Sequence, residues 1–326
     1  MRGKLSENLE FWVTNLPDPL KDTPVINLAI PGTHDSMTYD MRALSPVAPD
    51  AEACVHWLHK VIPCVIKRWA VTQKLSLHEQ LLNGIRYLDF RISFRRQEQR
   101  YYFVHGLYCE EIVDPLQEIR DFLDSHPGEV IVLDIQHTYQ FEEKNHVELM
   151  AMLTDVLGQR VWPRDGRLLR HWTPRVAEQT GQQVVIIYRN AQAHGVSNFW
   201  TSDDWPTPWP NETNVGRLQK SLERGLASRS PHKGYVTQCV LTPNISYTVP
   251  RFLSSLQRTC ARKVFRKLLS WIAAQRPGVW RPGDAPTVNV VLADFVEIQD
   301  SEFCKIVVDL NLKMHTAKII TMESSA

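Results

Sequence analysis

The sequence lacks the features that mark several large classes of protein. No apolar run approaches the roughly 18 residues that a membrane-spanning helix needs. The 37 Lys and Arg residues nearly balance the 36 Asp and Glu residues, and the net charge of +1 gives no global field that would favour nucleic acid. We therefore expect no nucleic-acid partner, and a local cluster of side chains has to bind any anionic ligand.

The cysteines lack a pattern as well. The six lie far apart with no Cys-x-x-Cys pair, which predicts reduced, mostly buried thiols rather than disulfides or a zinc site. The first ten residues contain no apolar core of the kind found in a secretory signal. Together these absences predict a soluble, cytoplasmic protein.

Short apolar runs that end in polar or ionisable residues are abundant, and such runs are typical of buried strands. Helical patterns fall between several of them, and this alternation predicts a parallel sheet. At 326 residues with no linker, we expect one α/β barrel as a single domain over 1–326, with a core of about 22–313. The expected strands are 25–30, 85–92, 101–105, 130–137, 184–189 and 288–294, and the expected helical regions are 75–82, 113–125, 142–157 and 249–274.

The carboxyl ends of parallel barrel strands converge on one face, so the ionisable residues there should form a site. His34 follows a Pro-Gly turn and is a candidate general base, and His105 is a candidate general acid. Such a pair suits cleavage of a phosphodiester by an internal hydroxyl. Arg91 would hold the charge that develops on phosphorus oxygens. Asp294, flanked by apolar residues, would orient a histidine, and Asp35 would do the same on the leaving-group side.

Structural interpretations remain open for several of these residues. A lone histidine at a strand end is more often a satisfied hydrogen-bonding group than a catalyst. Asp89 is explained equally well as a cap or as a salt-bridge partner of Arg86 or Arg91. Arg189 fits a structural clamp at the barrel rim, and His137 fits a solvated loop.

Three segments carry a resemblance to a known family. Residues 30–36 (Ile-Pro-Gly-Thr-His-Asp-Ser), 80–91 (Gln-Leu-Leu-Asn-Gly-Ile-Arg-Tyr-Leu-Asp-Phe-Arg) and 104–106 (Val-His-Gly), in this order and spacing, resemble the X-domain of phosphatidylinositol-specific phospholipase C. Within that family, the segments resemble the small eukaryotic X-domain-containing proteins without accessory domains. The resemblance covers about 28–294, and it implies a distorted TIM barrel that releases diacylglycerol and an inositol phosphate from phosphatidylinositol-type lipids.

The resemblance also assigns roles to the residues. It implies that His34, oriented by Asp294, takes the proton of the inositol 2-hydroxyl, and that His105, helped by Asp35, protonates the diacylglycerol oxygen. Arg91 resembles the arginine that replaces calcium in bacterial members. Calcium-dependent relatives have an asparagine and three carboxylates at the positions of Asp35, Asp89, Arg91 and Gln136. A guanidinium would repel calcium, so we predict chemistry without a metal or cofactor.

Recognition of the inositol ring is less completely implied. Arg189 resembles the family's inositol-binding arginine, and Asp89 is counted with the substrate-binding residues. Gln136 or His137 stands near the position of a bacterial lysine. The expected strand at 235–240 has no aspartate where bacterial enzymes use one, and Cys239 or its neighbours stand there.

A lipid substrate requires the barrel mouth to meet a membrane surface. Residues 54–69 combine aromatic and basic side chains as an interfacial helix would, and 199–209 are rich in Trp and Pro as an interfacial loop would be. The alternative is that both are rim segments packed by their own tryptophans.

Two rival functions remain open at this stage. One is a lipid-binding or scaffolding protein that kept the barrel but little catalysis, which the missing aspartate favours. The other is a metal-dependent glycerophosphodiester phosphodiesterase-like enzyme. That class holds its metal with a Glu-x-Asp pair, and the Asp89-Phe-Arg91 sequence argues against it.

Overall fold

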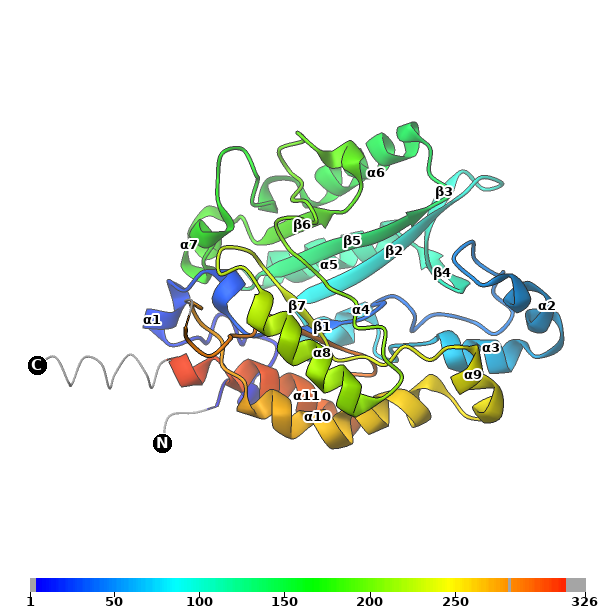
Figure 1. Cartoon of the computed structure of the whole chain (residues 1–326). Coiled ribbons are helices and arrows are strands. Elements are labelled where there is room, and N and C mark those ends of the chain that lie inside the picture. The colour runs from blue at the N-terminus through cyan, green and yellow to red at the C-terminus, as the bar shows by residue number, and fades with distance from the viewer. Residues whose placement is uncertain (1–3, 281–282, 315–326) are drawn as a thin grey trace, which may run out of the picture.

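A computed structural model describes residues 4–280 and 283–314, and Figure 1 shows the whole chain. The two ends of the domain predicted over 1–326 lie outside these residues. None of the described helices is long and apolar enough to cross a membrane. All six cysteines are free thiols, but only three are buried, because Cys54 and Cys64 are exposed and Cys109 is half-buried. The expectation of mostly buried thiols was therefore only half right.

The described residues form an eight-stranded sheet. Parallel pairing gives the order β6-β5-β2-β1-β8-β7, and β3 and β4 form an antiparallel extension on β2. The strands are β1 (Ile30–Thr33), β2 (Tyr87–Arg95), β3 (Arg100–His105), β4 (Leu107–Glu111), β5 (Ile131–Tyr139), β6 (Val184–Tyr188), β7 (Val236–Gln238) and β8 (Val290–Ala293).

Helices cover the outside of this sheet (Figure 1). Strand side chains that point outward, such as Leu88 and Leu133, pack in the larger apolar core against helix residues such as Leu149. The helices are α1 (Asp18–Lys21), α2 (Ala53–Val61), α3 (Pro63–Ala70), α4 (Leu77–Leu82), α5 (Val113–Ser125), α6 (Glu143–Leu157), α7 (Pro174–Thr180), α8 (Val215–Ser228), α9 (Ile245–Thr248), α10 (Arg262–Ala274) and α11 (Ile298–Asp309). Short 3₁₀ turns join several of them, and a π-helical turn over Gln257–Ala261 leads into α10.

The first expected strand was displaced along the chain. Residues Val25–Asn27 form a 3₁₀ turn, and β1 begins at Ile30 and contains the Pro-Gly pair expected to end it. The backbone of residues 25–29 bonds to the buried amides of Asn289 and Asn311 instead of to a neighbouring strand. Gly32 is needed in β1, because a Cβ there would lie 2.9 Å from the Tyr87 ring.

The direction of the third expected strand was also wrong. β3 runs antiparallel to β2 as part of a hairpin, so it is not one of the parallel barrel strands. The hairpin turn between β2 and β3 folds the chain back, so the carboxyl end of β3 still returns to the barrel mouth. His105 therefore reaches the predicted face by a different route from the one expected.

The Trp- and Pro-rich segment 199–209 closes the barrel between β6 and β7. Trp200 exchanges backbone hydrogen bonds with Ile186 and Tyr188 of β6, while the Asp204 and Pro206 carbonyls accept from residues 234 and 236 at β7. Trp200 and Trp205 are buried, so the prediction of an interfacial loop was wrong for these two tryptophans. Trp209 alone among the three is exposed, at 42% of its surface. The indole rings fill the seam because no regular strand pairs with both edges.

Candidate active site

His34 and Asp294 meet because β1 and β8 are paired in register. Thr33 lies opposite Ala293, so the residues that follow them leave adjacent strand ends together. The two are 260 positions apart in sequence, yet His34 Nδ1 lies 2.8 Å from Asp294 Oδ1. Both side chains are buried. Burial disfavours the charged imidazolium, but Asp35 and Asp294 outweigh burial and raise the pKa of His34 above its usual 6.5.

Proton placement at His34 follows from its partners. Asp294 accepts the Nδ1 proton, so in the neutral ring Nε2 carries the lone pair. Arg91 Nη2 lies 3.0 Å from this nitrogen and can donate to it. The neutral ring therefore presents a basic nitrogen toward the centre of the site, which is the arrangement that a general base requires.

Asp35 joins the two histidines. Its carboxylate Oδ2 lies 3.2 Å from Nε2 of His34 and 3.1 Å from Nε2 of His105. The residue sits in the left-handed backbone region at φ 43°, which turns its side chain back under the strand ends. Burial alone would raise the pKa of Asp35, but Arg91 and the two histidines lower it below its usual value. The carboxylate is thus held as an anion in a buried place.

Each ring nitrogen of His105 has an acceptor beside it. Nδ1 lies 2.6 Å from the Ala70 carbonyl, which can only accept, so this nitrogen carries a proton. Nε2 faces the Asp35 carboxylate, which also lies beside Nε2 of His34. The two histidine rings therefore meet at one carboxylate oxygen.

Arg91 occupies the centre of the cluster. The pairing of β2 with β5 has a β-bulge beside Phe90 and Arg91, with Gln136 as the extra residue on β5. Nε lies 2.5 Å from Asp35 Oδ1, and Nη2 lies 3.5 Å from Asp89 Oδ2. These carboxylates raise the pKa of Arg91 against the effect of burial, so the guanidinium is permanently charged. The ion-pair interpretation of Asp89 is correct for Arg91, whereas Arg86 pairs with Glu129.

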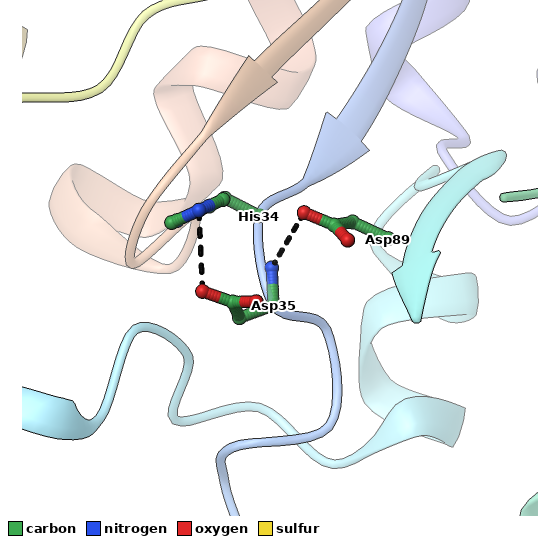
Figure 2. Close-up of side chains that lie close together, drawn as sticks. All are labelled: His34, Asp35 and Asp89. Carbon is green, nitrogen blue, oxygen red and sulfur yellow. Dashed lines mark hydrogen bonds and ion pairs between the residues drawn. The ribbon is translucent and has the colours of Figure 1, made fainter. Parts of the chain in front are cut away.

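His34, Asp35 and Asp89 could together offer ligands to a metal ion, since one ligand atom from each lies within 4.8 Å of the others (Figure 2). Figure 2 shows Asp89 accepting a hydrogen bond from the backbone of Asp35, and the Asp35 carboxylate beside the His34 ring. However, all three also contact the guanidinium of Arg91. A divalent cation would have to displace that fixed cation, so these residues fit an arginine better than a metal.

Sequence reasoning missed a layer of residues beneath the histidines. Thr72 Oγ1 donates to the backbone carbonyls of His34 and Asp35, and Gln73 Nε2 donates to the carbonyls of His34 and Ala293. Both side chains are fully buried. They follow α3 directly, so one short segment (70–73) supports both histidines. A buried polar pair outside any strand gave no sequence signal for this role.

Arg189 forms an ion pair within the barrel mouth. Its Nε and Nη2 bond to the two oxygens of Asp134 at 2.8 and 2.6 Å, and Nη2 also reaches the Trp205 carbonyl. Tyr87 donates to the same carboxylate at 2.5 Å. Burial raises the pKa of Asp134 even though Arg189 opposes the rise. The arginine thus forms the clamp that the structural interpretation described, and Asp134 was not among the predicted site residues.

The remaining predicted residues surround this clamp. Gln136 is half-buried and donates to Asp134 and Thr207. His137 is exposed, and its pKa is lowered by burial of the ring nitrogens and by the Arg91 charge. Segment 199–209 lies beside β6; Thr207 Oγ1 accepts a hydrogen bond from Gln136, and the Thr207 carbonyl accepts one from Gln238 of β7. Cys239 is buried.

The Trp209 ring lies over the ring of His34, the candidate general base. The Trp209 ring lies 5.3 Å from the His34 ring, centroid to centroid, and tilts over it. The void next to Asp35, Asp89 and Arg91 holds only about 10 Å³. Trp209 was predicted as part of a membrane loop, and its contact with His34 was not foreseen.

Comparison with curated relatives shows the family to which the chain belongs. The chain is 34% identical over 305 residues to PI-PLC X domain-containing protein 2 of Mus musculus, covering 92% of this chain and 87% of the relative. It is 33% identical over 318 residues to the human PI-PLC X domain-containing protein 3, covering 95% and 96%. The chain belongs to the PI-PLC X domain-containing proteins. No protein-family model matches it.

The fold of this PI-PLC X domain-containing protein is that of bacterial enzymes. A pentafluoro-phenylalanine variant of phosphatidylinositol-specific phospholipase C from Staphylococcus aureus superposes with a TM-score of 0.65 at 16% identity. The match covers 95% of this chain and 99% of that structure. At this identity the likeness establishes the fold alone, and it confirms the distorted TIM barrel implied by the sequence resemblance.

Proposed function

We propose that the protein is a phospholipase C that cleaves phosphatidylinositol-type lipids into diacylglycerol and an inositol phosphate, without calcium. The observation that carries this proposal is the pair of histidines beside one arginine, with Nε2 of both rings next to Oδ2 of Asp35. In the proposed reaction His34 supplies a lone pair at Nε2, and His105 supplies a proton at Nε2. Family membership supports the substrate class.

The proposed reaction uses each nitrogen once. His34 Nε2 takes the proton of the inositol 2-hydroxyl, whose oxygen then forms a bond to phosphorus. The bond from phosphorus to the diacylglycerol oxygen breaks, and that oxygen takes the Nε2 proton of His105. Arg91 holds the non-bridging oxygens as negative charge builds on them. Asp294 stabilises the imidazolium formed at His34, and Asp35 keeps His105 charged before the transfer.

Calcium independence rests on Arg91. The guanidinium already neutralises Asp35 and Asp89, which would otherwise be the anionic ligands of an ion. The Arg91 guanidinium, which is part of the chain and cannot dissociate, thus supplies the positive charge that the phosphate oxygens require.

The proposed membrane contact is made by exposed side chains of α2. Trp57 and Val61 lie four residues apart on one helix face and are 66% and 64% exposed, and Lys60 lies beside them. Aromatic and aliphatic side chains flanked by lysine suit the interfacial region of a bilayer. Of the three tryptophans in the predicted segment 199–209, only Trp209 retains the exposure that such a contact requires.

The test is turnover of phosphatidylinositol vesicles by purified protein in the presence of a chelator. His34→Ala and His105→Ala should each lower the rate by about 10²–10⁴-fold, the usual range for a positioned acid or base. His194→Ala, an exposed histidine outside the site, serves as the matched control and should retain full activity. Full activity in either site variant would contradict the mechanism.

A second candidate function is a lipid-binding or scaffolding role on the same barrel. The observation that favours it is the Arg189–Asp134 ion pair, which occupies Nε and Nη2 of the arginine that the family resemblance assigns to inositol. This candidate predicts vesicle binding without turnover of any phosphoinositide, whether or not calcium is added.

A further inference from the structure

A hollow lies at the rim of the barrel, outside the catalytic cluster. It has a volume of about 210 Å³ and opens between the last turn of α3 and the first turns of the long helical stretch that ends as α10. Its walls are joined directly, because Arg68 Nη1 donates to the Leu253 carbonyl and Trp69 Nε1 donates to the Phe252 carbonyl. The lining residues are Arg68, Leu253, Ser254, Ser255, Gln257, Arg258 and Arg262.

The charged residues that line this hollow are all basic. Arg68, Arg258 and Arg262 line it, and its described lining contains no acidic residue. Across residues 4–280 and 283–314, no carboxylate forms an ion pair with any of the three guanidinium groups. Ser254 and Ser255 also line it, and serine hydroxyls can donate to an anion. The chemistry of the hollow is therefore that of a phosphate-binding site.

The surroundings indicate which phosphate it would meet. Leu253 is 72% exposed and Phe252 is 47% exposed, and both border a second, shallower hollow of about 380 Å³ beside the first. Figure 1 shows α9 and α3 at the same end of the molecule as α2, which carries the exposed Trp57. Arginines set among exposed apolar side chains match the boundary between lipid headgroups and acyl chains better than bulk solvent.

We propose that Arg68, Arg258 and Arg262 form a second lipid site that binds the phosphate of an anionic phospholipid other than the substrate and holds the barrel mouth on the membrane. The proposal rests on the proposed function only in placing the protein at a lipid surface. Arg68 also lies two residues before Ala70, whose carbonyl holds His105, and segment 70–73 supports His34. A lipid bound here would therefore be anchored to the segment that positions both histidines.

The experiment measures partition of the full-length protein onto phosphatidylcholine vesicles with and without phosphatidic acid, with no phosphoinositide present. Removing two charges with the double variant R258Q/R262Q should weaken binding to the anionic vesicles by about 30-fold, because each basic residue at such a surface contributes about fivefold. The lysine variant R258K/R262K should retain most of the binding. Since no substrate is present, the result is independent of whether the protein cleaves phosphatidylinositol.

The matched control is K220Q/R224Q. These two exposed residues on α8 have the same spacing and the same loss of charge but lie outside the hollow. The control should change binding less than threefold. An equal loss in both double variants would mean diffuse charge attraction and would overturn the site, as would unchanged binding of R258Q/R262Q. Binding of inorganic phosphate without binding of anionic vesicles would overturn the assignment to a lipid.

Discussion

Replacing Asp294 with asparagine should change both the rate and the pH dependence of the proposed reaction. The carboxylate lies 2.8 Å from His34 Nδ1 and is buried, so its charge acts on the imidazolium with little screening. A hydrogen bond to a charged group typically contributes about 1.5–3 kcal/mol. Because about 1.36 kcal/mol corresponds to one pKa unit, Asp294→Asn should lower the pKa of His34 by about one to two units.

The direction of the pH effect follows from the proposed role of His34, which must be unprotonated to accept a proton. The base works only when neutral, and its raised pKa places the acidic limb of the rate profile above pH 6.5 in the native protein. Activity should therefore be lost as the pH falls through that raised value. In Asp294→Asn the limb should move to lower pH by one to two units, while the alkaline limb, assigned to His105, should stay in place.

The maximal rate should fall as well. Asparagine can present its amide nitrogen to Nδ1, which stabilises the tautomer with the proton on Nε2 and so removes the basic lone pair. A loss of about 10²–10⁴-fold at the optimum is expected for a misoriented base. The rate would thus fall even where more of the ring is neutral.

The assay is steady-state cleavage of phosphatidylinositol in mixed micelles between pH 5 and 9, with a chelator present. Asp309→Asn is the control, because Asp309 bonds to Ser6 and contacts neither histidine. An acidic limb that keeps its midpoint in Asp294→Asn would refute the assignment of that limb to His34. A shifted limb in Asp309→Asn would show that a distant charge suffices.

Four further predictions test other parts of the structure. With a substrate whose leaving group is a nitrophenolate, His105→Ala should lose far less activity than on phosphatidylinositol, since that leaving group needs no proton; equal losses would contradict its role as acid. Arg91→Lys should lower kcat by about tenfold or more, because an ammonium cannot hold two oxygens in a fork, and unchanged kinetics would refute a bidentate contact. Trp209→Ala should raise KM more than it lowers kcat, with Trp209→Phe restoring the value, because the half-exposed ring borders the mouth. Glu129→Ala should lower the free energy of unfolding by about 3–5 kcal/mol in urea titration, because it leaves Arg86 buried without its ion-pair partner, and a loss below about 1 kcal/mol would contradict this.

The sequence was informative wherever one strand carried its own signal. Short apolar runs predicted β2, β5, β6 and β8 within a few residues. The helical pattern over 113–125 also matched α5. Local periodicity depends on neighbouring residues alone, so it survives the absence of tertiary information.

Contacts between residues that are far apart in the sequence could be predicted only from the family resemblance. His34 and Asp294 were matched in that way, and the distance between them depends on the register of β1 and β8. Asp134 shows the corresponding failure. Asp134 lay inside the expected strand 130–137, but its ion pair with Nε and Nη2 of Arg189 could not be predicted, because nothing local specifies which cation a buried carboxylate meets.

Residue order, by itself, determined the strand and helix pattern, the balance of charge and the chemical types available at the barrel mouth. Tertiary structure alone decided that β3 runs antiparallel, that the tryptophans at 200 and 205 seal the barrel seam rather than face a lipid, and that Trp209 covers His34. The reason is physical: apolar and aromatic side chains are buried wherever the fold leaves an unfilled gap. A Trp-rich segment indicates either a gap that the rings fill or a surface that binds lipid, and the sequence does not distinguish the two.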